Sequence, residues 1–254
     1  MTIVLIGFIV GLCISYSGVG AGSLTTPLII LFLGYDASTA IGSDLVFSLG
    51  TKVVAFLTHM RAQTVNYAAL AFLSLGGVPG AIAGVLVSGW LHTHVPLDQV
   101  NHILKIALGV ALLAAAAAVA FSRTPAKNGA TDGAAPPMPR VPLVLIGLLV
   151  GTLVSITSIG SGSLTLPLLL LVLSSAQLRR LVGTDVAFAV VLLVPAIIGH
   201  WRIGDVNFKL AGLLLAGSIP GVLIGTPLAV RLPERAFRSG LAVILVVVGL
   251  RLFW

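Results

Sequence analysis

Long apolar runs separated by short polar gaps make up most of the chain, and they fall into two sets of four. The runs cover roughly 2–33, 41–58, 67–89 and 102–121 in the first set, and 142–173, 183–198, 208–230 and 238–253 in the second. A run of about 17–25 apolar residues forms one helical crossing of a bilayer, whose hydrocarbon core is about 30 Å thick. The pattern therefore predicts an all-α polytopic membrane protein, with three transmembrane helices after the first run of each set.

The first run of each set is too long for a single crossing. A continuous helix of some 32 residues would reach about 48 Å, at about 1.5 Å per residue. Its middle holds clustered serine and glycine followed by proline, at 17–27 and again at 157–167. Such residues interrupt a helix, so each first run is predicted to form two half-helices joined by a turn. At membrane depth such a turn must line a cavity that is enclosed by protein or filled with water.

Motifs recur between the two sets at a spacing of about 140 residues. SGVGAGSLTTP at 17–27 returns as TSIGSGSLTLP at 157–167, and IGSD at 41–44 returns as VGTD at 182–185. The chain is therefore two copies of one unit. The first copy is predicted at 1–121, a flexible cytoplasmic linker at 122–141 and the second copy at 142–254. A duplicated apolar unit interrupted by glycine at matching places indicates a secondary transporter.

Composition supports this class and excludes a soluble domain. Hydrophobic residues make up 58% of the 254 residues and charged residues 8%, against about 25% in a soluble domain. The net charge of +7 does not indicate a nucleic-acid partner, because most Lys and Arg lie in short gaps between apolar runs. In those gaps they act as topology signals, and the expected macromolecular surroundings are the lipid bilayer.

The positive charges favour copies of opposite orientation. If each copy makes an odd number of full crossings, one side collects nine Lys and Arg residues, namely Arg61, Arg123, Lys127, Arg140, Arg179, Arg180, Arg231, Arg235 and Arg238. The other side keeps three, namely Arg202, Lys209 and Arg251. An even number of crossings gives about seven against five, which fits the positive-inside rule less well. We therefore predict inverted-topology repeats, with the linker cytoplasmic and both termini outside.

The glycine-rich turns are the candidate substrate site. Small residues expose backbone N–H groups, and the half-helix after each turn directs its positive N-terminal end into the cavity. Two such ends, together with hydroxyl groups, would hold an oxyanion, and a cation in mid-segment would attract it. The predicted substrate-binding residues are Gly18, Gly20, Gly22, Ser23, Thr25, Gly160, Ser161, Gly162, Ser163, Thr165 and Lys52. The alternative is that the small residues merely allow close helix packing.

Polar residues in or beside the other runs are the candidates for coupling or gating, namely Asp44, Asp185, His59, His200, Asn66 and Asn207. The aspartates would carry protons or hold the shape of a neighbouring turn. The histidines would relay protons or anchor helix ends, and the asparagines would cap a helix or reach the substrate. The spacing of His92, His94 and His102 does not indicate a metal site, and no cofactor is predicted.

The order of these motifs resembles the TauE/SafE family, which is also called the toluene sulfonate uptake permease family. The resemblance rests on a glycine-rich turn with Leu-Thr-x-Pro, then Gly-[Ser/Thr]-Asp, then a Pro-Gly segment, each given twice over nearly the whole chain. It implies a non-enzymatic secondary transporter of the bacterial inner membrane for sulfur-containing anions such as sulfite, sulfoacetate or other organosulfonates. Members often have a denser glycine run in the first motif, where this chain has Ala21 and Ser161.

Two other functional classes stay open as alternatives. An anion channel would need a ring of charges or a continuous polar stripe, which neither copy supplies. An intramembrane hydrolase would pair Ser161 or Ser163 with His200, but duplication does not serve a single catalytic site. Alternating access accounts for the duplication better. The sequence leaves open whether the anion is exported or taken up, whether a proton or another ion is coupled, and how many subunits assemble.

Overall fold

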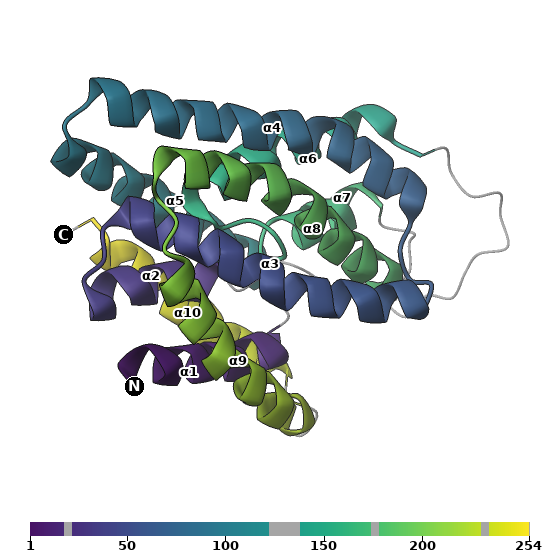
Figure 1. Ribbon diagram of the computed structural model, residues 1–254. Helices are drawn as coiled ribbons and strands as arrows, with labels where there is room; N and C mark the ends of the chain where they lie inside the picture. The colour runs from purple at the N-terminus through teal and green to yellow at the C-terminus, as the bar shows by residue number, and fades with distance from the viewer. Residues whose placement is uncertain (18–21, 122–137, 174–177, 230–233, 254) are drawn as a thin grey trace, which may run out of the picture.

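A computed structural model of the chain describes residues 1–17, 22–121, 138–173, 178–229 and 234–253. These residues form α-helices and no strand, and the helices are α1 Thr2–Ser17, α2 Gly22–Leu33, α3 Ala37–Arg61, α4 Tyr67–His94, α5 Leu97–Phe121, α6 Arg140–Thr157, α7 Thr165–Val172, α8 Leu178–Ile203, α9 Phe208–Ala229 and α10 Glu234–Arg251. Helices α4 and α6 lie side by side on one flank and α1 and α9 on the opposite flank, with α3 and α8 between them (Figure 1). The predicted all-α fold is confirmed.

The first segment of each copy is two helices, as the sequence predicts. The break in the second copy is described at 158–164, whereas 18–21 lie outside the described residues. The halves of the second copy are unequal, because α6 has 18 residues and α7 has 8, so α6 alone is long enough to cross a bilayer. Helix α6 also begins at Arg140, inside the predicted linker, whose residues 122–137 lie outside the described part.

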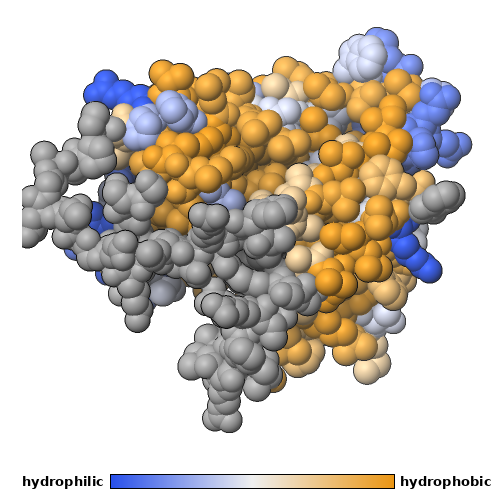
Figure 2. All heavy atoms as spheres, turned by 180° about the vertical axis from the view of Figure 1, so that it is seen from behind, coloured by the Kyte–Doolittle hydropathy of each residue, from blue (hydrophilic) through white to orange (hydrophobic). Residues whose placement is uncertain are grey.

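The surface of the helices is suited to lipid. Within the described residues, six helices are long and apolar enough to span a membrane, namely α3, α4, α5, α6, α8 and α9. Large apolar side chains point outward, among them Phe32, Leu171 and Leu223, each at least 70% exposed. Figure 2 shows a broad apolar face with hydrophilic residues gathered toward its ends. Water would not solvate such a surface, and the chain is a multi-pass membrane protein.

Glycines hold α1 against α9 and α4 against α6. The contact glycines are Gly7 and Gly11 on α1, Gly217 and Gly221 on α9, Gly76 and Gly80 on α4, and Gly147 and Gly151 on α6. A Cβ atom on any of them would collide with a backbone carbonyl oxygen of the facing helix, so glycine at four-residue spacing allows this approach. The contacts advance in the same direction along both helices, so each pair is parallel. Each pair joins one helix from each copy, and the two copies therefore exchange partners.

Hydrogen bonds between the copies show where the central helices begin. The N–H of Asn66, just before α4, donates to Thr184 Oγ1 in α8 at 2.9 Å. The N–H of Asn207, just before α9, donates to Ser43 Oγ in α3 at 3.0 Å. With the parallel pairs, these bonds put the starts of α4, α6 and α8 at one end of the molecule. The starts of α1, α3 and α9 lie at the other end, because α4 begins where α3 finishes. The orientation of the copies in a membrane stays a prediction.

Replacing Gly217 by alanine should lower the free energy of unfolding by about 1–3 kcal/mol, because the new methyl group must push α9 away from α1. The matched control is Gly212→Ala in the same helix, where a Cβ atom would meet nothing within 4 Å. This control should keep or raise stability, since alanine favours helix over glycine. Thermal unfolding of the purified protein in detergent measures both variants, and equal unfolding temperatures would contradict the packing argument.

Candidate functional site

The second broken turn meets the first copy at Asp44, a fully buried carboxylate on α3. Its Oδ2 atom accepts a hydrogen bond from Thr26 Oγ1 of α2 at 2.8 Å and another from Ser158 Oγ of the turn at 2.7 Å. Gly22, at the start of α2, lies so close to Ser158 that a Cβ atom would collide with the Ser158 carbonyl oxygen. The two interrupted segments are therefore joined through one carboxylate.

The backbone of the second turn needs residues that tolerate positive φ. Ser158 has φ 59°, Gly160 has φ 135° and Gly162 has φ 97°. Glycine adopts such angles without the steric cost that a side chain brings. Thr165, in the first turn of α7, donates its hydroxyl to the Gly160 carbonyl at 3.0 Å. The turn thus has a defined shape that the repeated glycines make possible.

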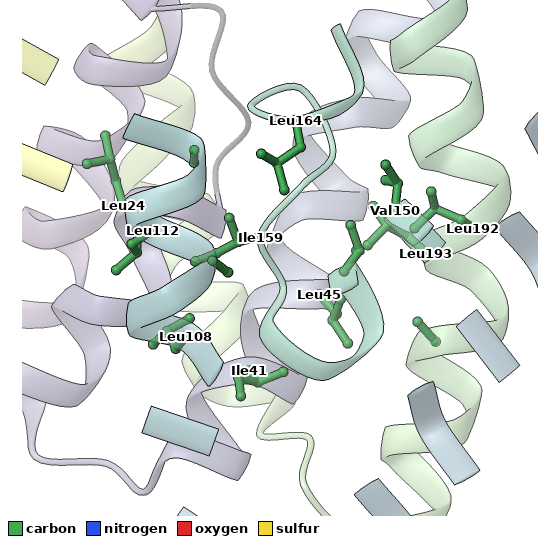
Figure 3. Packing of buried hydrophobic residues seen from close by; sticks show 14 of the residues in the cluster. Leu24, Ile41, Leu45, Leu108, Leu112, Val150, Ile159, Leu164, Leu192 and Leu193 are labelled. Atoms are coloured by element: carbon green, nitrogen blue, oxygen red, sulfur yellow. The ribbon is translucent and has the colours of Figure 1, made fainter. Parts of the chain in front are cut away.

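Protein encloses the turn on its apolar side. Ile159 and Leu164 point from the turn into the buried cluster, near Leu112 of α5 and Leu45 of α3 (Figure 3). All four side chains are at most 8% exposed. The turn therefore lies within the protein rather than against lipid, as irregular backbone at membrane depth requires.

Asp185 of α8 makes the second link between the copies. Its Oδ1 atom accepts the Gly162 N–H at 3.1 Å, and its Oδ2 atom lies 3.6 Å from Lys52 Nζ of α3. Lys52 is 8% exposed and Asp185 is 3% exposed, so this is a buried ion pair. The position equivalent to Lys52 in the second copy is Leu193. The duplicated centre therefore holds two matching aspartates but one lysine.

Asp44, Ser48 and Lys52 lie on one face of α3, because they are spaced by four residues. Asp44 Oδ1 and Ser48 Oγ are buried and make no hydrogen bond to the described residues. Buried polar atoms are nearly always bonded, so these two can bind a further group. With both aspartates ionised, the two carboxylates and one ammonium group give the centre a formal charge of −1.

The structure brings most of the predicted substrate residues to this centre. Those that are described and buried there are Gly22, Ser23, Thr25, Gly160, Ser161, Gly162, Ser163, Thr165 and Lys52. Gly18 and Gly20 lie outside the described residues. One predicted donor, the Gly162 N–H, already binds Asp185. The role of these residues in substrate binding stays a prediction.

The coupling candidates divide into three groups. Asp44 and Asp185 lie at the centre, and their bonds to the second turn are those expected of residues that hold its shape. Asn66 and Asn207 cap helices, since their Oδ1 atoms accept N–H groups of α4 and α9. His59 and His200 lie near the ends of α3 and α8, respectively. No group of described residues could hold a metal ion.

Sequence reasoning missed three central residues, Thr26, Ser48 and Ser158. Thr26 and Ser158 belong to the repeated motif, but their equivalents in the other copy are Leu166 and Gly18. A comparison of the copies emphasises shared residues and passes over these. The sequence did contain a signal for these residues: one copy has a hydroxyl side chain at a position where the other copy has leucine or glycine.

Comparison with known proteins places the chain among membrane transporters. The family model described as "Sulfite exporter TauE/SafE" matches residues 3–252. The chain is 36% identical over 257 residues to "Probable membrane transporter protein YjnA" of Bacillus subtilis (strain 168), with 99% of each chain covered. It is 23% identical to "Probable membrane transporter protein MJ0441" of Methanocaldococcus jannaschii, over 98% of this chain and 93% of that one. No solved structure matches the chain.

The bond between Ser158 and Asp44 should stabilise the assembled copies. Ser158→Ala should lower the free energy of unfolding by about 1–3 kcal/mol, because a buried carboxylate loses a donor. The matched control is Ser74→Ala on α4, whose buried hydroxyl makes no hydrogen bond to the described residues. A double-mutant cycle with Asp44→Asn, measured by thermal unfolding in detergent, isolates the pair. Equal effects of Ser158→Ala and Ser74→Ala would contradict the link.

Proposed function

Because this chain belongs to the sulfite exporter TauE/SafE family of membrane transporters, we propose that it is a secondary carrier of small sulfur-containing oxyanions. Sulfite, sulfoacetate and other organosulfonates are the substrate class. The carrier works by alternating access, with the anion held at the centre between the broken segments. The family description supports the sulfur chemistry, and the printed names of the relatives support transport.

The observation that carries the proposal is the buried Lys52–Asp185 pair beside the second turn. Lys52 is the one cation of the described central residues, and an ammonium group is the natural partner of a sulfonate or sulfite oxygen. Ser161 and Ser163 of the turn are buried nearby and supply hydroxyl donors. The site thus offers a charge and hydroxyl groups in an apolar enclosure, where electrostatic attraction is strong.

The charge of the centre supports coupling to protons. Opposite charges 3.6 Å apart attract by about 4 kcal/mol at an effective dielectric constant of about 20. An anion that binds Lys52 must replace this attraction while it adds negative charge to a centre that already has formal charge −1. A proton taken up by Asp185 removes both obstacles, and a proton taken up by Asp44 removes the excess negative charge. We therefore assign the two aspartates to proton uptake that accompanies the anion.

The glycine-packed pairs are the moving bodies in this proposal. Each pair, α1 with α9 and α4 with α6, joins helices of different copies at a backbone distance that only glycine permits. Motion between the copies as units would break these contacts. Motion of one pair against the other keeps them and shears the central layer of α3 and α8, where Asp44 and Lys52 lie. The opposite starts of the two broken segments support the inverted repeats that such a cycle needs.

Lys52→Leu should weaken binding of sulfite and sulfoacetate at least about tenfold, a loss of about 1.4 kcal/mol. Leucine is the residue of the second copy at this position, so the helix should accept it. Titration calorimetry of the purified protein measures the affinity, and flux into lipid vesicles measures transport. The control is Lys209→Leu, which removes an exposed lysine from α9. Unchanged affinity in Lys52→Leu would refute the assignment.

Binding of sulfoacetate should tighten as the pH falls, because proton uptake accompanies the anion. Sulfoacetate is preferred to sulfite, which itself takes up a proton near neutral pH. In Asp185→Asn the affinity should vary less with pH, since one acceptor of the proton is gone. Proton uptake is measured directly by repeating the calorimetry in buffers of different ionisation enthalpy. Zero uptake at every pH would contradict proton coupling and leave the anion site intact.

A further inference from the structure

A second group of ionisable side chains lies where α4 and α8 end. Asp205, in the connection between α8 and α9, has one histidine on each carboxylate oxygen. His92 Nε2 of α4 lies 3.2 Å from Oδ1, and His200 Nδ1 of α8 lies 3.1 Å from Oδ2. The side chains are 14% exposed for His92, 7% for Asp205 and 2% for His200. The three residues therefore form a buried cluster whose outer member is His92.

The remaining ring nitrogens show which protons are required. His92 Nδ1 lies 2.8 Å from the Ser88 carbonyl, and His200 Nε2 lies 2.8 Å from the Ser155 carbonyl. A carbonyl only accepts, so each of these nitrogens must carry hydrogen. A neutral ring would then present a lone pair to Asp205. The contact between His200 and Asp205 is a hydrogen bond, which requires a proton because the carboxylate only accepts, and the 3.2 Å approach of His92 Nε2 to Asp205 Oδ1 is favourable only if it contains a proton as well.

Together, the protons assigned to the two rings and to their contacts with Asp205 give the cluster a net charge of +1 in the observed arrangement. The charge is the same whether Asp205 is ionised between two imidazolium rings or protonated beside one. Loss of one proton gives a neutral cluster in which only one of the two histidine contacts with Asp205 can persist. His92 is the more exposed ring, so its contact is the one that water reaches first.

We propose that His92, Asp205 and His200 form a proton-binding latch that fastens the end of α4 to the α8–α9 connection and opens when the cluster loses a proton. The latch joins α4 to α8 through Asp205, and to α6 through the Ser155 carbonyl that faces His200 Nε2. It lies apart from Lys52 and Asp185 and does not depend on which anion is carried. Its proton would control the opening of one end of the molecule.

The latch belongs to one end only. The position equivalent to Asp205 in the first copy is Thr64, whose hydroxyl lies 2.8 Å from His59 Nδ1. Threonine carries no charge, and its hydroxyl donates to the His59 carbonyl at 3.1 Å and can accept from a neutral His59 ring, so that pair needs no extra proton. The opposite end of the molecule therefore has a hydrogen bond in place of a carboxylate held between two rings.

The surroundings supply few competing charges. On α4, His94 is exposed and stacks on Trp90. On α8 and α9, Arg202 and Lys209 are exposed and form no ion pair with the described residues. On α3, the neutral Gly42 packs against the Asp205 backbone. Among the described residues, Asp205 forms ion pairs with His92 and His200 and with no other group.

Two buried hydroxyls are available to a rearranged cluster. Ser88 Oγ and Ser155 Oγ belong to the residues whose carbonyls accept from the two rings, and neither makes a hydrogen bond to the described residues. Buried hydroxyls are rarely left unbonded. These two hydroxyls are therefore available as hydrogen-bond partners if the cluster rearranges.

The protonation of the native cluster can be measured directly. Nitrogen NMR of histidine-labelled protein in lipid vesicles distinguishes rings with one and with two N–H groups, and His92→Gln and His200→Gln assign the signals. The cluster should lose one proton, as one shared step, between about pH 5 and about pH 8. A proton count that stays constant over this range overturns the proposal, as does a cluster with no doubly protonated ring and no protonated Asp205 at the lower pH.

The movement is tested by two variants with opposite expectations. Spin labels at Thr93→Cys and Lys209→Cys, in a Cys13→Ser background, report the separation of α4 from α9. His92→Gln should keep a short distance between the two labels at both about pH 5 and about pH 8, because an uncharged amide N–H can donate to Asp205. Asp205→Thr, which copies Thr64, should show the long distance at both, because it removes the carboxylate that holds His92 of α4.

The matched control is His94→Gln, which removes an exposed histidine two residues from His92 and should preserve the native pH response. A pH-dependent distance that survives in Asp205→Thr overturns the latch. A native protein whose distance does not change between about pH 5 and about pH 8 overturns it as well. Neither outcome affects the anion site, since calorimetric binding to Lys52 is measured separately.

Discussion

A polar group at membrane depth must find its partners within the protein, and this requirement fixes the centre of the molecule. The irregular backbone at 158–164 can exist there because Asp44 and Asp185 accept its donors and apolar helices enclose it. The same carboxylates would be costly if they stood alone, since a charge in the bilayer interior costs several kcal/mol. The turn and the carboxylates thus stabilise each other. Because α3 and α8 carry these carboxylates, they must lie in the middle of the helix layers.

The outer layers follow a different rule. Lipid gives helices no hydrophobic reason to associate, so close backbone packing has to supply the attraction. Glycines at four-residue spacing do this between α1 and α9 and between α4 and α6. Because each of these pairs takes one helix from each copy, the duplication in the sequence does not coincide with the rigid parts of the structure. A transport cycle that keeps the contacts of these glycine-packed pairs must deform the polar central layer of α3 and α8. A ligand bound in that layer can influence the deformation.

The sequence predicts the helices well, because length, apolar character and clustered glycine are local properties. Both first segments consist of two helices and three helices follow each of them, as the pattern predicts, although several helices extend beyond the predicted ranges, such as α5, which begins at Leu97, and α8 Leu178–Ile203. The exchange of partner helices could not be predicted, since the sequence around Gly76 and Gly147 does not identify the helix against which each glycine packs. Contacts that exist in one copy only were missed for the same reason. Thr26 bonds Asp44, but its equivalent Leu166 cannot, and His92 meets Asp205 from a distant helix end.

The two copies are therefore similar in backbone and different in charge. The position equivalent to Lys52 in the second copy is Leu193, and the position equivalent to Asp205 in the first copy is Thr64. Such differences cannot by themselves decide the direction of net transport, because a carrier at equilibrium obeys the gradients of its solutes whatever its shape. On the proposed mechanism, they decide which protonation state favours which conformation, and hence how fast each end opens at a given pH. A symmetric duplication would give two ends that respond alike, whereas the proposed latch gives one end a response to protons that the other end lacks, and Lys52 gives the centre its proposed response to anions.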